Sequence, residues 1–147
     1  MAQVKDLLKT KGSDVWSVSP DTSVLDALKV MDEKDVGALL VLESGSLVGI
    51  FSERDFARAI VETGTCVITT EVKEYMTSKV FTIAPPNSVE DCMQVMSAKK
   101  IRHLPVMEND KLVGIISIGD VVKELIASQE STISNLENYI EGRGYGQ

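Results

Sequence analysis

LVGIFSERD, at residues 47–55, occurs again as LVGIISIGD at residues 112–120. When the chain is shifted by 65 residues, 15–62 aligns with 80–127 without a gap, and 17 of the 48 aligned positions are identical. Several mismatches keep their chemical character, as where Trp16 aligns with Phe81 and Ser17 with Thr82. An internal repeat of this length predicts two copies of one structural unit.

Each copy predicts the order strand, helix, strand, strand, helix. Short β-favouring stretches stop at a proline, and apolar residues at near-helical spacing follow behind a serine that can cap the helix. A strand–turn–strand pattern comes next, and a second helix closes the copy. In the two copies these elements fall at 15–20 and 80–85, 22–36 and 87–101, 38–52 and 104–117, and 53–62 and 118–128. A unit of about 50 residues is marginal alone, so we expect the two sheets to pack together.

Three segments lie outside the copies. Residues 1–14 predict a short N-terminal helix, 63–79 an ordered inter-repeat segment, and 128–147 a C-terminal helix extension ending in a loose tail. Apolar residues at 4-3 spacing continue into that extension and form an a/d seam, which predicts packing against this chain or a second copy. The seam positions are Val122, Ile126, Gln129, Ile133, Leu136 and Ile140.

The composition is that of a soluble globular protein, with 44% hydrophobic and 25% charged residues. A net charge of −7 argues against nucleic acid as a partner, because such binding relies on neutralising phosphates. The longest apolar run, 37–42, is too short to span a membrane, and no secretory signal is visible, so we expect a cytoplasmic protein.

An enzymatic function is not indicated. The sequence has no Walker loop, GxGxxG, HExxH or nucleophile–base–acid set, and it contains one histidine. A single histidine without partner ligands does not make a zinc site, so we expect neither catalytic residues nor a metal site.

The repeated element order, the V-x-S/T-V/I-x-P opening and the G-I-x-S-x-x-D ending resemble a tandem pair of CBS domains, or Bateman module. The resemblance covers 15–127 and extends to stand-alone two-CBS proteins. It implies a mixed α/β fold in which two β-α-β-β-α repeats intertwine about a pseudo-twofold axis, usually as a homodimer. It also implies adenosyl ligands: AMP, ADP, ATP, NAD(H) or S-adenosylmethionine.

In that family the closing aspartate accepts hydrogen bonds from ribose hydroxyls, and the preceding serine helps to hold the ligand. A carboxylate suits a vicinal diol because each hydroxyl can donate to one oxygen. The corresponding residues here are Ser52 with Asp55 and Ser117 with Asp120. The same pairs also fit ordinary helix capping boxes, and the two roles are compatible.

The resemblance further implies two clefts, each borrowing its first strand from the other copy. In both, an aromatic residue is a candidate for adenine stacking, with core packing as the alternative. We expect ligands with more phosphate charge to prefer the cleft of Asp120, because basic residues precede its strand. One cleft would combine Ser117, Asp120, Arg102 and His103 with Trp16 and Ser17, and the other Ser52, Arg54 and Asp55 with Phe81 and Thr82.

The sequence therefore predicts a non-catalytic sensor that binds an adenine nucleotide and signals to a separate effector protein. AMP or another mononucleotide is favoured, followed by NAD(H). The alternative is a dimeric protein-interaction module whose clefts are vestigial and whose C-terminal helix is the working surface.

Overall fold

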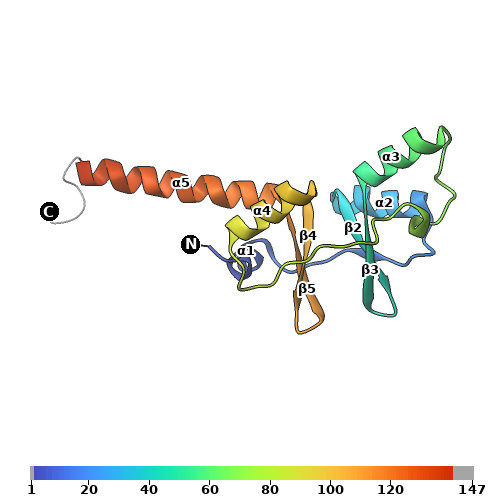
Figure 1. Ribbon diagram of the computed structural model, residues 1–147, viewed down its shortest axis with the longest axis horizontal. Coiled ribbons are helices and arrows are strands. Elements are labelled where there is room, and N and C mark those ends of the chain that lie inside the picture. The colour runs from blue at the N-terminus through green and yellow to red at the C-terminus, as the bar shows by residue number, and fades with distance from the viewer. Residues whose placement is uncertain (1, 141–147) are drawn as a thin grey trace.

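The computed structural model describes residues 2–140 and contains two small sheets surrounded by helices (Figure 1). The predicted order of elements is complete in the first repeat, and in the second an isolated bridge takes the place of the opening strand. The elements are α1 (Val4–Lys11), β1 (Ser17–Val18), α2 (Val24–Lys34), β2 (Ala38–Glu43), β3 (Ser46–Ser52), α3 (Glu53–Thr63), the 3-10 helix η1 (Val72–Glu74), α4 (Val89–Lys99), β4 (His103–Glu108), β5 (Lys111–Ser117) and α5 (Ile118–Ile140).

The two hairpins pair their strands in equivalent registers. β2 pairs antiparallel with β3, and β4 with β5, so that Ala38 faces Ser52 just as His103 faces Ser117. β1 adds a parallel strand to the first sheet. In the second repeat the expected opening strand is reduced to one parallel bridge, Ile83 with Val106. Apart from that shortened strand, the structure confirms the repeat.

Serine caps begin the repeat helices where the sequence predicts them. The hydroxyls of Ser23 and Ser88 accept hydrogen bonds from the backbone N–H three residues on, which satisfies a donor that the helix leaves free. The turns of both hairpins, at 44–45 and 109–110, have positive φ angles, as tight two-residue hairpin turns require.

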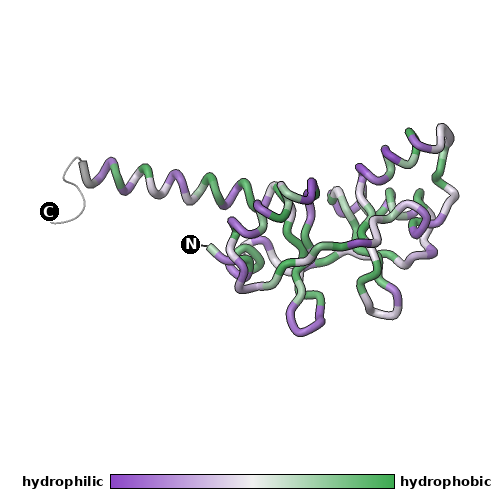
Figure 2. Tube along the Cα trace, viewed as in Figure 1, coloured by the Kyte–Doolittle hydropathy of each residue, from purple (hydrophilic) through white to green (hydrophobic). Residues whose placement is uncertain are grey.

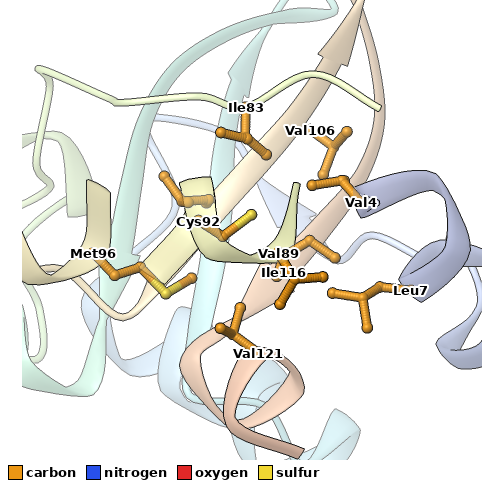
Figure 3. Packing of buried hydrophobic residues seen from close by; sticks show 10 residues of the cluster. Val4, Leu7, Ile83, Val89, Cys92, Met96, Val106, Ile116 and Val121 are labelled. Atoms are coloured by element: carbon orange, nitrogen blue, oxygen red, sulfur yellow. The ribbon is translucent and has the colours of Figure 1, made fainter. Parts of the chain in front are cut away.

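Each repeat is completed by the segment that precedes the other one. Val4 and Leu7 of α1 point into the core of the second repeat, beside Val89 and Ile116 (Figure 3). In the same way Val72, at the start of η1, belongs to the core of the first repeat. The two halves are therefore intertwined, as the resemblance implied.

The two segments that precede the repeats are also related to each other in sequence. Val4 N–H donates to the carbonyl of Asn87, and Val72 N–H to that of Thr22. These contacts relate VKDLLKTK at 4–11 to VKEYMTSK at 72–79 with an offset of 68 residues. Residues 12–14 have no counterpart between 79 and 80. They account for the difference between this offset of 68 and the offset of 65 that relates the rest of the chain.

α5 extends away from the body of the molecule (Figure 1), and apolar residues alternate with polar ones along it (Figure 2). The side chains of Val122, Ile126, Ile133 and Leu136 are 40–57% exposed. No helix within residues 2–140 combines the length and apolar character needed to cross a bilayer. The predicted tail at 142–147 lies outside the described residues.

Candidate functional site

A cavity of about 540 Å³ lies where the two repeats meet, and it is called here the Asp55 cavity. The first repeat contributes the turn from β3 into α3, residues 52–55, together with Arg58. The inter-repeat segment contributes Thr77 and Lys79, and the second repeat contributes 80–81 and 99–103. Residues distant in sequence therefore converge on the Ser-x-x-Asp turn of the first repeat.

Asp55 anchors this cavity and is the one charged residue classed as buried within 2–140, with 8% of its surface exposed. Its Oδ2 accepts from the backbone N–H and the hydroxyl of Ser52, each at 3.0 Å, while its Oδ1 accepts from Thr77 Oγ1 at 3.2 Å. Asp55 N–H donates back to Ser52 Oγ, so the capping box is present. The carboxylate faces the cavity from a fixed position at the helix start.

Basic side chains dominate the remaining wall. Phe81 also lines the cavity, with Lys99 Nζ 5.0 Å and Lys79 Nζ 5.8 Å from its ring centroid. Two carboxylates, Glu53 and Asp55, also line the cavity. The basic residues are Arg54, Arg58, Lys79, Lys99, Lys100 and Arg102. On a chain of net charge −7, this is a local concentration of positive charge.

Arg102 and His103 line the Asp55 cavity as well as lying beside the turn where they were expected. His103 pairs with Ser117 and the Arg102 carbonyl accepts from Ile118 N–H, while both residues also form part of the wall of the Asp55 cavity. The reason is that the starts of β2 and β4 abut, so that a Cβ on Gly37 would lie 3.9 Å from the His103 ring. The chain preceding β4 therefore faces the turn of the other repeat, and Arg54 Nη1 donates to the Lys100 carbonyl across this junction at 3.3 Å.

The environment of His103 lowers its pKa. Burial lowers the pKa of its imidazole below the ordinary 6.5, and the charges of Lys11 and Arg102 lower it further, against the opposite influence of Asp120 and Asp55. At neutral pH the positive charge of the cavity therefore comes from its lysines and arginines.

The equivalent turn of the second repeat, 117–120, has a different partner. Asp120 Oδ2 accepts from Ser117 N–H at 2.8 Å and from Lys11 Nζ at 2.6 Å. Burial alone would raise the pKa of Asp120, but the Lys11 ammonium and the Ser117 N–H outweigh it and hold that pKa below its ordinary value. Here too the capping role is present, since Asp120 N–H donates to Ser117 Oγ.

Comparison with known proteins identifies the family. The family model for the CBS domain matches residues 4–62 and 72–127. The chain belongs to the CBS-domain family, as a tandem pair. Both matches include the preceding segments, α1 and the η1 region.

Known relatives of this CBS pair are matched over most of their own length. The mitochondrial CBS domain-containing protein CBSX3 of Arabidopsis thaliana is 37% identical over 97% of this chain and 73% of its own length. The crystal structure of the CBS domain NE2398 is 44% identical with a TM-score of 0.81, covering 86% of this chain and 99% of that one. The CBS pair of protein MJ0100, solved with 5′-methylthioadenosine and S-adenosylmethionine, shares the fold at 24% identity, with a TM-score of 0.75 over 88% of this chain and 98% of that one.

Three further predicted residues of this CBS pair lie outside the Asp55 cavity: Thr82, and Trp16 and Ser17, which were expected in the cleft of Asp120. Thr82 was expected beside Asp55, but it lines a separate depression with Ser46 and Met107, because adjacent residues in an extended chain point to opposite sides. Ser17 lies in β1, opposite Leu40. Trp16 is 38% exposed, and Lys34 Nζ lies 4.4 Å from its ring centroid, an arrangement that parallels Lys99 and Phe81.

Sequence reasoning missed the contributions of Thr77 and Lys79 to the Asp55 cavity. The match of 72–79 to 4–11 was the available signal, because it marks the inter-repeat segment as part of the unit and not as a connection. Arg58, one helical turn beyond Asp55, lies with its Nη1 3.9 Å from Asp55 Oδ1.

Proposed function

We propose that this CBS pair is a non-catalytic sensor that binds an adenine nucleotide in the Asp55 cavity and communicates its occupancy to a separate protein. One observation supports this above the others. A buried carboxylate, an aromatic ring and six basic side chains line a single cavity on an acidic chain. These are the groups that a ribose, a base and a phosphate require.

Asp55 is the proposed ribose acceptor. A carboxylate has about four lone-pair positions, and three are used by Ser52 N–H, Ser52 Oγ and Thr77 Oγ1. One position on Oδ1 remains for a ribose hydroxyl. The Thr77 hydroxyl can rotate to accept from the other hydroxyl, which would free a second position.

Phe81 and the basic residues are proposed to hold the remaining parts of the ligand. An aromatic face provides a stacking surface for adenine. Arg102 can form a planar bidentate pair with a phosphate, whereas lysines such as Lys79 and Lys99 act as point charges on flexible stems.

The proposed ligand is AMP or another adenine mononucleotide, with ADP, ATP and NAD(H) as the next candidates. A volume of about 540 Å³ falls within the range of about 300–1,000 Å³ found for small-molecule sites. The adenosyl ligands of the MJ0100 pair show that this fold can hold such groups in another protein.

Isothermal titration with adenosine, AMP, ATP, NAD and NADH tests the proposal. We expect the wild type to bind a phosphorylated ligand, and Arg102→Ala to weaken AMP by about 1.5–3 kcal/mol, the range for a hydrogen bond to a charged group. Lys123→Ala, on the exposed side of α5 outside the cavity, is the matched control and should bind as the wild type does. The absence of any binding near millimolar concentration would overturn the proposal.

A second candidate function is suggested by the exposed apolar residues of α5. Val122, Ile126, Ile133 and Leu136 form a stripe at the 4-3 spacing that two-stranded coiled coils use. We propose that this stripe packs against the α5 of a second copy and forms a homodimer. If the nucleotide panel gives no binding, a dimeric interaction module with vestigial clefts becomes the preferred function.

A further inference from the structure

Lys11 occupies the carboxylate of the second Ser-x-x-Asp turn. Its Nζ donates to Asp120 Oδ2 at 2.6 Å and to the Ile115 carbonyl at 2.8 Å. The Lys11 side chain is 30% exposed and that of Asp120 25%. A partly buried ion pair with an additional hydrogen bond is a well-defined contact, and it holds an ammonium against the carboxylate that a ribose hydroxyl would approach.

α1 holds Lys11 at this position. Lys11 is the last residue of α1, and Val4 and Leu7 of the same helix are buried in the core of the second repeat (Figure 3). The N–H groups of Val4 and Lys5 also donate to the carbonyls of Asn87 and Pro85. The lysine is therefore attached to the repeat whose carboxylate it contacts.

The first repeat provides an internal comparison. There the chain leaves its helical turn at Met76 and becomes extended, and Thr77 forms a backbone bridge with Ile50. The hydroxyl of Thr77, in place of an ammonium, reaches Asp55 at 3.2 Å. Lys79, which corresponds to Lys11 at the offset of 68, lines the Asp55 cavity instead. Asp55 thus accepts its hydrogen bonds from neutral groups, with Arg58 Nη1 3.9 Å away, whereas Asp120 accepts one from a cation.

We propose that Lys11 is a built-in occupant of the Asp120 site that excludes ribose, so that the two sites fill unequally and the Asp55 cavity fills first. This inference rests on the proposed function. A hydroxyl that approaches Asp120 Oδ2 must displace a charge-assisted hydrogen bond, whereas at Asp55 it meets a neutral hydroxyl that can reorient. A site that is competent only when Lys11 has moved away loses affinity in proportion to the fraction of time it is free.

Because the lysine stem is flexible, the exclusion of a ligand by Lys11 depends on the charge of that ligand. A ligand with an anionic group close to the Asp120 turn offers Lys11 a new partner, and an uncharged nucleoside offers none. Adenosine is therefore the probe that separates the two sites, because it carries the ribose without a phosphate.

The experiment is isothermal titration of adenosine into the full chain and three variants. Lys11→Met keeps the length of the stem and removes the charge and the donors, Lys11→Arg keeps both, and Lys9→Met alters an exposed lysine of the same helix. We expect one adenosine per chain for the wild type, Lys11→Arg and Lys9→Met. Lys11→Met should bind two, with the second site gaining at least tenfold in affinity.

Lys11→Gln replaces Lys11→Met if the latter fails to fold, as judged by circular dichroism. Two equal sites in the wild type, or one site in every protein, would overturn the inference while the proposed function stands. The same holds if AMP binds to the wild type and adenosine binds to none of the four proteins. If AMP does not bind either, the proposed function fails and the inference fails with it.

Discussion

Asp55 and Asp120 end the same motif, yet their chemistry differs because their partners come from other parts of the chain. Asp55 accepts hydrogen bonds from Ser52 and Thr77 and lies in a cavity rich in arginine and lysine. Asp120 is paired with Lys11. The local sequence sets the geometry of each carboxylate, through the capping box, and the neighbouring segment sets what the carboxylate is free to bind.

At the scale of single residues, the Lys11–Asp120 pair makes the free energy of unfolding depend on pH in the acidic range. Because the pKa of Asp120 is lowered in the folded protein, the stability from this pair is complete above the ordinary aspartate pKa of 3.8 and is lost as the pH falls through the lowered value. We expect the free energy of unfolding to fall less steeply between pH 5 and about pH 2 in Lys11→Met than in the wild type. The difference at neutral pH should be about 1 kcal/mol or less, since both side chains are partly exposed.

Urea unfolding followed by circular dichroism across this pH range measures the effect, with Lys9→Met as the control. An identical pH dependence in Lys11→Met and the wild type would contradict the ion pair.

At the scale of elements, two strand glycines allow the preceding segments to dock. A Cβ on Gly49 would lie 2.5 Å from Met76 Sδ and 3.1 Å from the Thr77 carbonyl, and one on Gly114 would lie 2.6 Å from Leu8 Cδ2. The glycines at the centres of β3 and β5 therefore leave room for η1 and α1 on the sheets. This contact also places Thr77 beside Asp55.

Gly49→Ala is expected to destabilise the fold by about 1–3 kcal/mol, the usual cost of overpacking. The backbone of Thr77 must move as well as the Met76 side chain, so the hydrogen bond to Asp55 should weaken. Gly119→Ala is the matched control. Its Cβ would meet Ser117 Oγ at 3.6 Å, an ordinary contact, and alanine favours the helix by up to about 1 kcal/mol. Chemical denaturation measures the free energy of unfolding of both variants. Equal values would contradict overpacking at Gly49.

α5 is the element proposed to join two copies. Its exposed apolar stripe predicts a particle of twice the 16.0 kDa chain mass in light scattering at micromolar concentration. We expect Ile133→Lys combined with Leu136→Lys to shift the protein toward the monomer, whereas Ser131→Lys with Ser134→Lys should not. A wild-type particle with the mass of a single chain would contradict dimerisation through α5.

At the scale of the whole molecule, the ungapped repeat was sufficient to predict the elements and the helix caps, and the resemblance to CBS pairs predicted that the two repeats intertwine. The repeat did not show that Arg102 and His103 also line the Asp55 cavity, because an alignment shows which residues are equivalent and not which surfaces face each other. That information comes from the approach of the start of β2 to the His103 ring. The role of 72–79 was hidden because three additional residues, 12–14, change the offset from 65 to 68.

The central claim is that the Asp55 cavity is the principal nucleotide site, and titration of AMP into Asp55→Ala and Asp120→Ala tests it most directly. We expect Asp55→Ala to lose about 1.5–3 kcal/mol of AMP affinity, because a charged hydrogen-bond acceptor for the ribose is removed. Asp120→Ala should keep the principal binding event at wild-type affinity. Loss of that event in Asp120→Ala, with Asp55→Ala binding as the wild type does, would contradict the account.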